Sequence, residues 1–226
     1  MMTIIAHRGA SADHPENTIE AFHGAATQGA DWVELDARLT ADGEIVVLHD
    51  AHLPDGRPLA SVDHADLPTS IPTLAAALDA CAPMGVNVEI KHFPGEPGFS
   101  DDRRLTDRVL DECAGMQSEL LITSFDYRTI ERVKTIDANV ATGFLVLADD
   151  DSVDPVSRAA AGGHDALNPW DRSVDRSLVE RCAAAGLAIN VWTVDDPVRL
   201  AELAEFGVDG VITNTPALAR AALEGG

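Results

Sequence analysis

Two histidines, an arginine and two carboxylates lie at or near the ends of strand-like runs within the first fifty residues. His7 and Arg8 follow the first apolar run, and Glu34 and Asp36 lie in the second. His49 ends a third run. Strand ends are where an α/β scaffold displays accessible side chains. Because an imidazole titrates near ~6.5, a histidine pair can accept and donate protons near neutral pH. The set predicts a metal-assisted acid/base site that acts on a phosphate ester.

The carboxylates are spaced for a shared cation. Glu34 and Asp36 are two residues apart in one strand-like run, so their side chains point to the same face. Glu89 repeats the pattern in a later run, with Lys91 on its face. Three oxygen donors without a thiolate favour a hard divalent cation, Mg²⁺ or Ca²⁺, over zinc. In the alternative, basic side chains balance the carboxylates without a metal: Arg8, Lys91 and Arg38.

The other histidines and the cysteines show no spacing typical of a catalytic or metal site. For these histidines we expect surface or loop positions: His14, His23, His52, His64, His92 and His164. The cysteines form no C-x-x-C pair, and we expect reduced, partly buried thiols at all three positions: Cys81, Cys113 and Cys182.

Strand-like and helix-like segments alternate along the whole chain. The predicted strands are 3–6, 32–38, 86–90, 120–124, 141–147, 165–168, 188–194 and 210–213. The predicted helices are 17–28, 73–81, 103–116, 127–136, 156–161, 176–185, 198–206 and 217–223. Asn17 is the predicted N-cap of the first helix, with Glu20 as its capping-box partner. Glycines at helix-to-strand joins are predicted to end helices: Gly29, Gly85, Gly186 and Gly207.

Eight strand–helix units predict an α/β protein with a (β/α)8 TIM-barrel fold, a single domain over residues 1–226. The paired carboxylates of the second strand would then face the barrel interior. An open doubly wound sheet is the alternative, disfavoured because no Gly-rich phosphate loop follows the first strand. An additional apolar run, 44–49, follows Asp42-Gly43, which is a hairpin signal. We expect this hairpin to return His49 to the top of the barrel.

The charge of the chain limits its partners. The formal net charge is −22, and only two of the sixteen basic residues are lysines. Such an excess along the whole chain indicates a halophilic surface, because the Debye length falls to ~3 Å at molar salt. The same charge argues against nucleic acid or an anionic membrane as a partner. No apolar run approaches the ~20 residues of a membrane span, and the N-terminus lacks a signal-peptide pattern, so we expect a cytoplasmic protein.

The ordered motifs resemble one known family over nearly the whole chain, the glycerophosphodiester phosphodiesterases. The resemblance lies in His7-Arg8-Gly9, Pro15-Glu16-Asn17-Thr18, Glu34-Leu35-Asp36, His49-Asp50, Ile71-Pro72-Thr73-Leu74, Glu89-Ile90-Lys91, Ser124-Phe125-Asp126, Val191-Trp192-Thr193-Val194 and 207–213. The family fold is a (β/α)8 barrel. The chain departs from the family pattern after His49-Asp50, where the segment expected to cover the substrate is abbreviated.

The resemblance implies a role for each matching residue. His7 and His49 would be the catalytic acid/base pair. The metal ligands would be Glu34, Asp36 and Glu89, holding one Mg²⁺ or Ca²⁺. The residues implied to bind the substrate are Arg8 and Lys91 at the phosphate, with Phe125 and Trp192 at the glycerol carbons. The reaction would be hydrolysis of a small-molecule glycerophosphodiester to glycerol phosphate and an alcohol.

Two other functions stay open at the level of sequence. One is a phospholipase-type phosphodiesterase that acts on lipid headgroups. The other is a non-catalytic module that binds glycerol phosphates. The sequence leaves the oligomeric state, the leaving alcohol and the individual roles of the two histidines undetermined.

Overall fold

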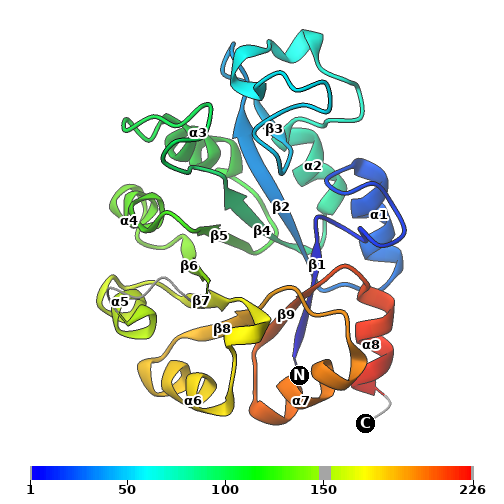
Figure 1. Cartoon of the computed structure of the whole chain (residues 1–226), viewed down its shortest axis with the longest axis vertical. Helices are drawn as coiled ribbons and strands as arrows, with labels where there is room; N and C mark the ends of the chain where they lie inside the picture. The colour runs from blue at the N-terminus through cyan, green and yellow to red at the C-terminus, as the bar shows by residue number, and fades with distance from the viewer. Residues whose placement is uncertain (1, 148–153, 225–226) are drawn as a thin grey trace.

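The computed structural model describes residues 2–147 and 154–224, and eight parallel strands within these ranges close into a barrel (Figure 1). Pairing of β1 with both β2 and β9 closes the ring. This confirms the predicted single-barrel fold over the alternative open sheet. The barrel strands are β1 Thr3–His7, β2 Trp32–Leu39, β4 Gly85–Ile90, β5 Leu120–Ser124, β6 Ala141–Val146, β7 Ala166–Pro169, β8 Ala188–Val191 and β9 Gly210–Thr213.

Helices surround the ring of strands, one after each barrel strand (Figure 1). In the described part of the chain they are α1 Ile19–Thr27, α2 Leu74–Cys81, α3 Arg104–Cys113, α4 Tyr127–Ile136, α5 Pro155–Ala161, α6 Arg176–Ala185, α7 Pro197–Phe206 and α8 Pro216–Glu224. Short 3₁₀ turns lie at η1 Leu59–Ser61, η2 His64–Asp66 and η3 Asp171–Ser173. Every predicted helix and strand is present, and the differences are confined to the ends.

The start of α1 differs from the prediction. Thr18, not Asn17, is the N-cap, and its Oγ1 accepts the backbone N–H of Ala21 at 3.2 Å. Asn17 has a left-handed backbone with φ of 58°, and its amide points into the barrel instead of capping the helix. The predicted capping box is therefore wrong, because the asparagine is used by the site.

Three of the four predicted helix-ending glycines have the positive φ of that role: Gly29, Gly186 and Gly207. Gly85 is the exception, since it begins β4 with an ordinary strand conformation. A Cβ added at Gly85 would lie 2.3 Å from the indole of Trp32 on the neighbouring strand. Gly85 is required by this close side-chain approach and not by a helix end.

The strand β2 continues into a hairpin, as predicted. β3 Ile45–Val47 pairs antiparallel with the end of β2, and Gly43 in the turn has a φ of 86°. Figure 1 shows β3 and the following cyan segment projecting from one side of the barrel. The hairpin brings the chain back along β2, so His49 lies at the carboxyl ends of the barrel strands.

Alternation along β2 separates the core from the site. Leu35 and Ala37 are fully buried against apolar side chains of the surrounding helices, including Phe22 and Leu74. Glu34, Asp36 and the other residues of opposite parity point into the barrel. The three cysteines are free and buried in the core, more deeply than the partial burial expected: Cys81, Cys113 and Cys182.

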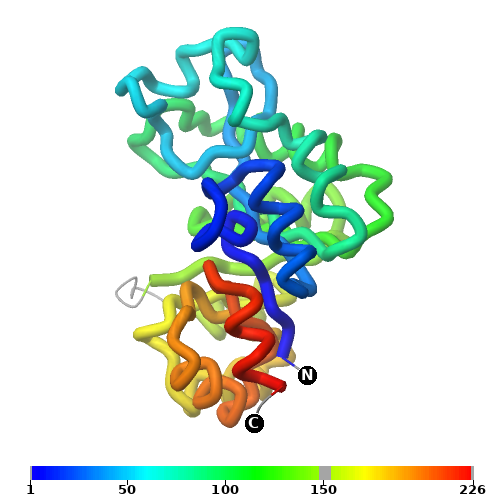
Figure 2. The backbone as a smooth tube through the Cα atoms, turned by 90° about the vertical axis from the view of Figure 1, so that its right-hand side faces the viewer, coloured from blue at the N-terminus to red at the C-terminus, as the bar shows by residue number. Residues whose placement is uncertain are grey.

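The two ends of the described chain lie close together, with β1 and α8 side by side in both views (Figures 1 and 2). Among the described residues, no helix has the length and apolar character required to cross a bilayer.

Candidate functional site

A pocket of about 360 Å³ opens at the carboxyl ends of the barrel strands. Eight of the nine residues predicted for the site line this pocket: His7, Arg8, Glu34, His49, Glu89, Lys91, Phe125 and Trp192. The ninth, Asp36, is fully buried just beneath it. The structure therefore brings together every residue that the sequence predicts for the site.

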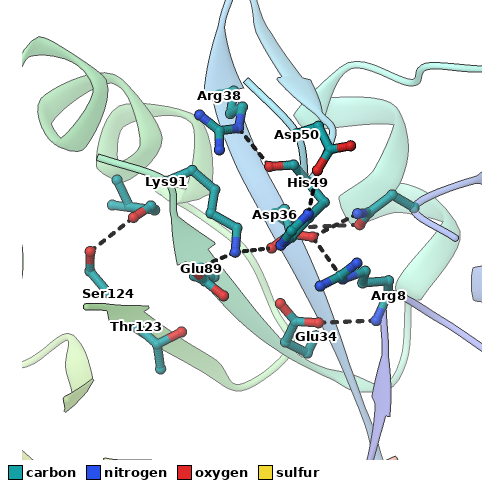
Figure 3. A network of polar contacts seen from close by, with 12 residues as sticks. Arg8, Glu34, Asp36, Arg38, His49, Asp50, Glu89, Lys91, Thr123 and Ser124 are labelled. Atoms are coloured by element: carbon teal, nitrogen blue, oxygen red, sulfur yellow. Dashed lines mark hydrogen bonds and ion pairs between the residues drawn. The ribbon is translucent and has the colours of Figure 1, made fainter. Parts of the chain in front are cut away.

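Strand register places the three carboxylates side by side. Asp36 on β2 is the direct neighbour of Glu89 on β4, and Glu34 lies on the same face of β2. One carboxylate oxygen from each residue lies within 4.8 Å of the other two. The ammonium of Lys91 lies 3.0 Å from Asp36 Oδ1 and 2.6 Å from Glu89 Oε1 (Figure 3).

The pKa values of the three carboxylic acids shift in different directions. Burial would raise the pKa of Asp36, but Lys91 and Arg8 outweigh it and hold that pKa at about 2. Burial and the adjacent Asp36 and Glu89 charges raise the pKa of Glu34 well above its usual value. Burial also raises the pKa of Glu89, against the attraction of Lys91. Glu34 is thus the carboxylate that most needs another positive charge.

The donor set fits a hard divalent cation. Three buried carboxylates converge with oxygen atoms only, which is the chemistry that Mg²⁺ and Ca²⁺ prefer. Glu34 Oε1 is buried without a hydrogen-bond partner in the described part of the chain, while Oε2 accepts the backbone N–H of Arg8 at 3.0 Å. A buried carboxylate oxygen without a donor is costly unless a cation or proton satisfies it.

Strained backbone holds the arginine beside the carboxylates. Arg8 and Asn17 both have left-handed φ values, 57° and 58°, and the N–H of Asn17 donates to the carbonyl of Arg8 at 2.9 Å. The Nδ2 of Asn17 donates to Asp36 Oδ2 at 2.7 Å, and Arg8 Nε lies 3.2 Å from the same oxygen. Such strain costs ~1–3 kcal/mol per residue and persists where surrounding contacts fix it.

The two histidines have different hydrogen-bond partners. His7 ends β1, and its Nδ1 lies 2.7 Å from Asn214 Oδ1. Burial and the neighbouring Arg8 charge lower the pKa of His7. His49 follows β3, is partly exposed, and places its Nδ1 2.8 Å from Asp50 Oδ1. Its carbonyl accepts from Arg38 Nε at 2.8 Å (Figure 3).

An aromatic wall lines part of the pocket. The rings of Phe125 and Trp192 meet edge to face at 5.5 Å, and Phe93 lies 5.7 Å from Phe125. The indole N–H of Trp192 donates to the carbonyl of Asn168 at 2.8 Å, which fixes the ring. Together with Leu145 these side chains give the pocket an apolar part of its lining, beside the charged residues.

The metal-free alternative expects three basic side chains to balance the carboxylates, and two of them do so. Arg8 and Lys91 contact Asp36, and Arg8 NH1 also contacts Glu16 at 2.9 Å. Arg38 instead pairs with Glu96 at 2.9 Å across the pocket mouth. Arg8 and Lys91 nevertheless line the pocket, so their predicted phosphate contacts stay a prediction.

Several residues of the site escaped the sequence interpretation: Asn17, Arg38, Phe93, Glu96, Asn214 and Asp195. Asn214 directly follows β9, so the strand-end rule that selected His7 also applied to it. Arg38 shares the face of Glu34 and Asp36 on β2, so the two-residue spacing applied to it too. The others lie in loops.

Two histidines predicted for the surface are buried. His92 is held between Ser100, Asp126 and Arg103, and His164 contacts Thr142. Neither position was signalled by periodicity. Both lie in loops, as predicted, but the surface position is wrong for both.

Relatives carry the same architecture along their whole length. A glycerophosphodiester phosphodiesterase of Caldanaerobacter subterraneus subsp. tengcongensis is 30% identical over 237 residues, covering 94% of each chain. A phosphodiesterase of Oleispira antarctica, solved with the product sn-glycerol-3-phosphate, superposes with a TM-score of 0.89 at 26% identity, over 98% of this chain and 96% of that one.

A Thermotoga maritima glycerophosphodiester phosphodiesterase superposes with a TM-score of 0.83 at 27% identity, covering 96% of each chain. The model of the glycerophosphoryl diester phosphodiesterase family matches residues 7–218, which run from His7 at the end of β1 into α8. By sequence as well as by fold, the chain belongs to the glycerophosphoryl diester phosphodiesterase family.

Proposed function

We propose that this protein hydrolyses glycerophosphodiesters to glycerol phosphate and an alcohol. The observation that carries the proposal is one pocket lined by two histidines and an aromatic wall, with a cluster of three carboxylates of which two line it. Membership of the family supports the reaction class. The Oleispira relative bound to sn-glycerol-3-phosphate supports a glycerol phosphate product.

The carboxylate cluster would hold one Mg²⁺ or Ca²⁺ through Glu34, Asp36 and Glu89. When bound, such a cation supplies Lewis-acid chemistry that neutralises phosphate charge. Arg8 and Lys91 bring two further positive charges to the same side of the pocket. These side chains bind and orient the phosphate, and they stabilise the negative charge that builds on it in the transition state.

His7 and His49 form the proposed acid/base pair. One accepts the proton of the nucleophile, and the other protonates the departing alkoxide. The nucleophile is the neighbouring hydroxyl of the substrate glycerol, whose oxygen bonds to phosphorus as the alcohol leaves. Water then opens the resulting cyclic phosphate with the proton roles reversed. This route requires no serine or cysteine nucleophile.

The aromatic wall binds the apolar part of the substrate. Phe125 and Trp192 present fixed ring surfaces beside the charged groups. The glycerol carbons pack against these rings while the phosphate faces Arg8 and Lys91. This arrangement orients the diester between the histidines.

We also infer the setting of the enzyme from its charge. With a net charge of −22, the protein takes a small anionic diester and does not bind nucleic acid or anionic membranes. A salt-rich cytoplasm suits this surface because salt shortens the range of repulsion. Residues 1–226 act as one catalytic domain.

Turnover of glycerophosphoethanolamine, with and without EDTA, tests the proposed function. We expect glycerol phosphate to be released, EDTA to stop its release, and Mg²⁺ or Ca²⁺ to restore it. Full turnover after exhaustive chelation would contradict the metal role of the three carboxylates.

Two further measurements separate the alternatives. Hydrolysis of a phospholipid in vesicles, without hydrolysis of the free diester, would indicate a phospholipase-type enzyme. Binding of glycerol phosphate without any turnover would indicate a binding module, which has no use for an acid/base pair.

A further inference from the structure

Asn214 connects the last barrel strand to the first. It directly follows β9, and its side chain meets His7 at the end of β1, 207 residues away in sequence. The Oδ1 of Asn214 lies 2.7 Å from Nδ1 of His7. We call the junction of β1 and β9 the barrel seam, so this hydrogen bond spans the seam beside the pocket.

Asp195 fixes the direction of the Asn214 amide. The Nδ2 of Asn214 donates to Asp195 Oδ2 at 2.6 Å, and its backbone N–H donates to Asp195 Oδ1 at 2.8 Å. Thr213 Oγ1 donates to the same carboxylate at 2.8 Å. Because an ionised carboxylate only accepts, the NH₂ of Asn214 must face Asp195. The carbonyl oxygen of the amide therefore faces His7.

A carbonyl oxygen beside Nδ1 determines which nitrogen of His7 carries the proton. Oδ1 of Asn214 can only accept, so Nδ1 of neutral His7 must be protonated. Ser11 Oγ lies 2.9 Å from the same Oδ1 and 2.7 Å from the His7 carbonyl, and its single proton can be donated to either oxygen. The Nε2 of His7 is left with a lone pair.

The charges around His7 agree with a neutral ring. Arg8 and Lys91 on one side oppose its protonation, while Asp36 favours it. His49 differs in its partner, since its Nδ1 lies 2.8 Å from the carboxylate of Asp50. The hydrogen bonds thus distinguish two histidines that the sequence left equivalent.

We propose that Asp195 and Asn214 are positioning residues that hold His7 in its Nδ1–H tautomer, with Nε2 as the proton acceptor of the reaction. His7 is then the base in the first step, and His49 is the acid that protonates the leaving alcohol. The catalytic role of His7 rests on the proposed phosphodiesterase function, whereas its tautomer follows from the hydrogen bonds alone.

Nuclear magnetic resonance of ¹⁵N-labelled histidine side chains tests the tautomer directly. At mildly alkaline pH, His7 of the wild type should show a protonated Nδ1 and an unprotonated Nε2, with its signals assigned by their loss in His7→Gln. In Asn214→Leu, which has no acceptor, the Nε2–H form should appear. A wild-type His7 in the Nε2–H form would overturn the proposal.

Two matched variants control the measurement. Asn214→Asp keeps an oxygen acceptor at the position, so the Nδ1–H tautomer should be retained. Asn139 makes a similar pair with Asp137, its N and Nδ2 lying 2.9 and 3.0 Å from Asp137 Oδ1, at the opposite end of the barrel. Asn139→Leu should leave both the His7 tautomer and turnover unchanged.

Kinetics then test the catalytic role. Asn214→Leu should lower kcat by ~10–100-fold, the usual effect of losing a group that orients a functional histidine, with little change in KM. In the wild type, the hydrogen bond from His7 to Asn214 raises the pKa of His7. Asn214→Leu removes this bond, so the pKa should fall and the acid limb of kcat/KM should move to lower pH. Asn214→Asp should move it to higher pH.

Failure of the proposed function would look different from failure of this proposal. If the wild type is inactive but His7 carries the Nδ1 proton, the phosphodiesterase function is wrong and the tautomer assignment stands. If the wild type is active, and Asn214→Leu retains the wild-type kcat, acid limb of kcat/KM and His7 tautomer, then Asn214 does not position His7. Circular dichroism of each variant confirms that it is folded.

Discussion

His7 and His49 differ in hydrogen-bond partner, although both are partly buried and both lie at the carboxyl ends of strands. His7 contacts an amide oxygen, whereas His49 contacts a carboxylate. A base benefits from a lowered proton affinity and an acid from a stabilised proton. The lowered pKa of His7 therefore suits the base of the proposed reaction.

His7→Ala and His49→Ala should each lower kcat by ~10²–10⁴-fold, the usual contribution of a positioned acid or base. His23→Ala is the matched control, because His23 lies on the exposed face of α1. Steady-state hydrolysis of a simple diester measures the rates. A folded variant with nearly full activity would remove that histidine from the mechanism.

His164 gives the fold a measurable pH dependence. Burial, then the charge of Lys134, lowers its pKa to about 4, compared with ~6.5 in an unfolded chain. The unfolded chain therefore binds the proton more readily, and stability is lost as pH falls from ~6.5 toward 4.

His164→Phe should flatten this part of the pH dependence, since the aromatic ring can still pack against Tyr127. Melting temperatures of wild type and variant between pH ~7 and ~5 test this. Parallel curves for the two proteins would show that His164 contributes no such linkage.

At the scale of elements, the close contact between β2 and β4 positions the carboxylates. These neighbouring strands place Asp36 beside Glu89 near their carboxyl ends, and Trp32 beside Gly85 at their amino ends. A shift of either strand would separate the ligands of the proposed cation. The fit of an indole over a glycine therefore affects a site several residues away along the same strands.

Gly85→Ala should destabilise the protein by ~1–3 kcal/mol, because the new Cβ would meet the Trp32 indole at 2.3 Å. Trp32→Leu in the same chain should relieve the clash. A thermal-unfolding double-mutant cycle of these two changes should give a favourable coupling. Additive effects would show that the ring moves aside without cost.

The number and type of the elements followed from hydrophobic periodicity, which depends on local sequence and on burial of one face. Helix ends were less predictable: Asn17 satisfies the requirements of a cap, but its amide is held by Asp36 instead. The carboxylates of the site could be predicted because a two-residue spacing along a strand puts side chains on the same face of the sheet.

The side chains that orient the site could not be found in this way. Spacing puts Arg38 on the face of Asp36, but its partners, the carbonyl of His49 and the carboxylate of Glu96, depend on loop paths. Asp195 acts on His7 only through Asn214, so its role becomes visible only when the barrel is closed.

At the scale of the whole molecule, charge dominates. The chain has thirty-eight acidic residues and only sixteen basic ones, so negative charges repel one another across the folded surface. This repulsion opposes compaction and also slows the approach of an anionic substrate.

Both the melting temperature and kcat/KM should rise between 0.1 M and molar KCl, because the Debye length drops from ~10 Å to ~3 Å. The rise should level off once screening reaches contact distance. Thermal melts and initial rates at constant pH measure the two effects. A melting temperature that stays flat or falls would contradict a halophilic surface.

The seam also determines when during its synthesis the protein becomes an enzyme. His7 ends the first barrel strand to be synthesised, while its partner Asn214 follows the last barrel strand. A nascent or prematurely terminated chain that lacks β9 has neither a closed ring nor an oriented base. The ring can therefore close only in one late step of synthesis, when the first and last barrel strands pair.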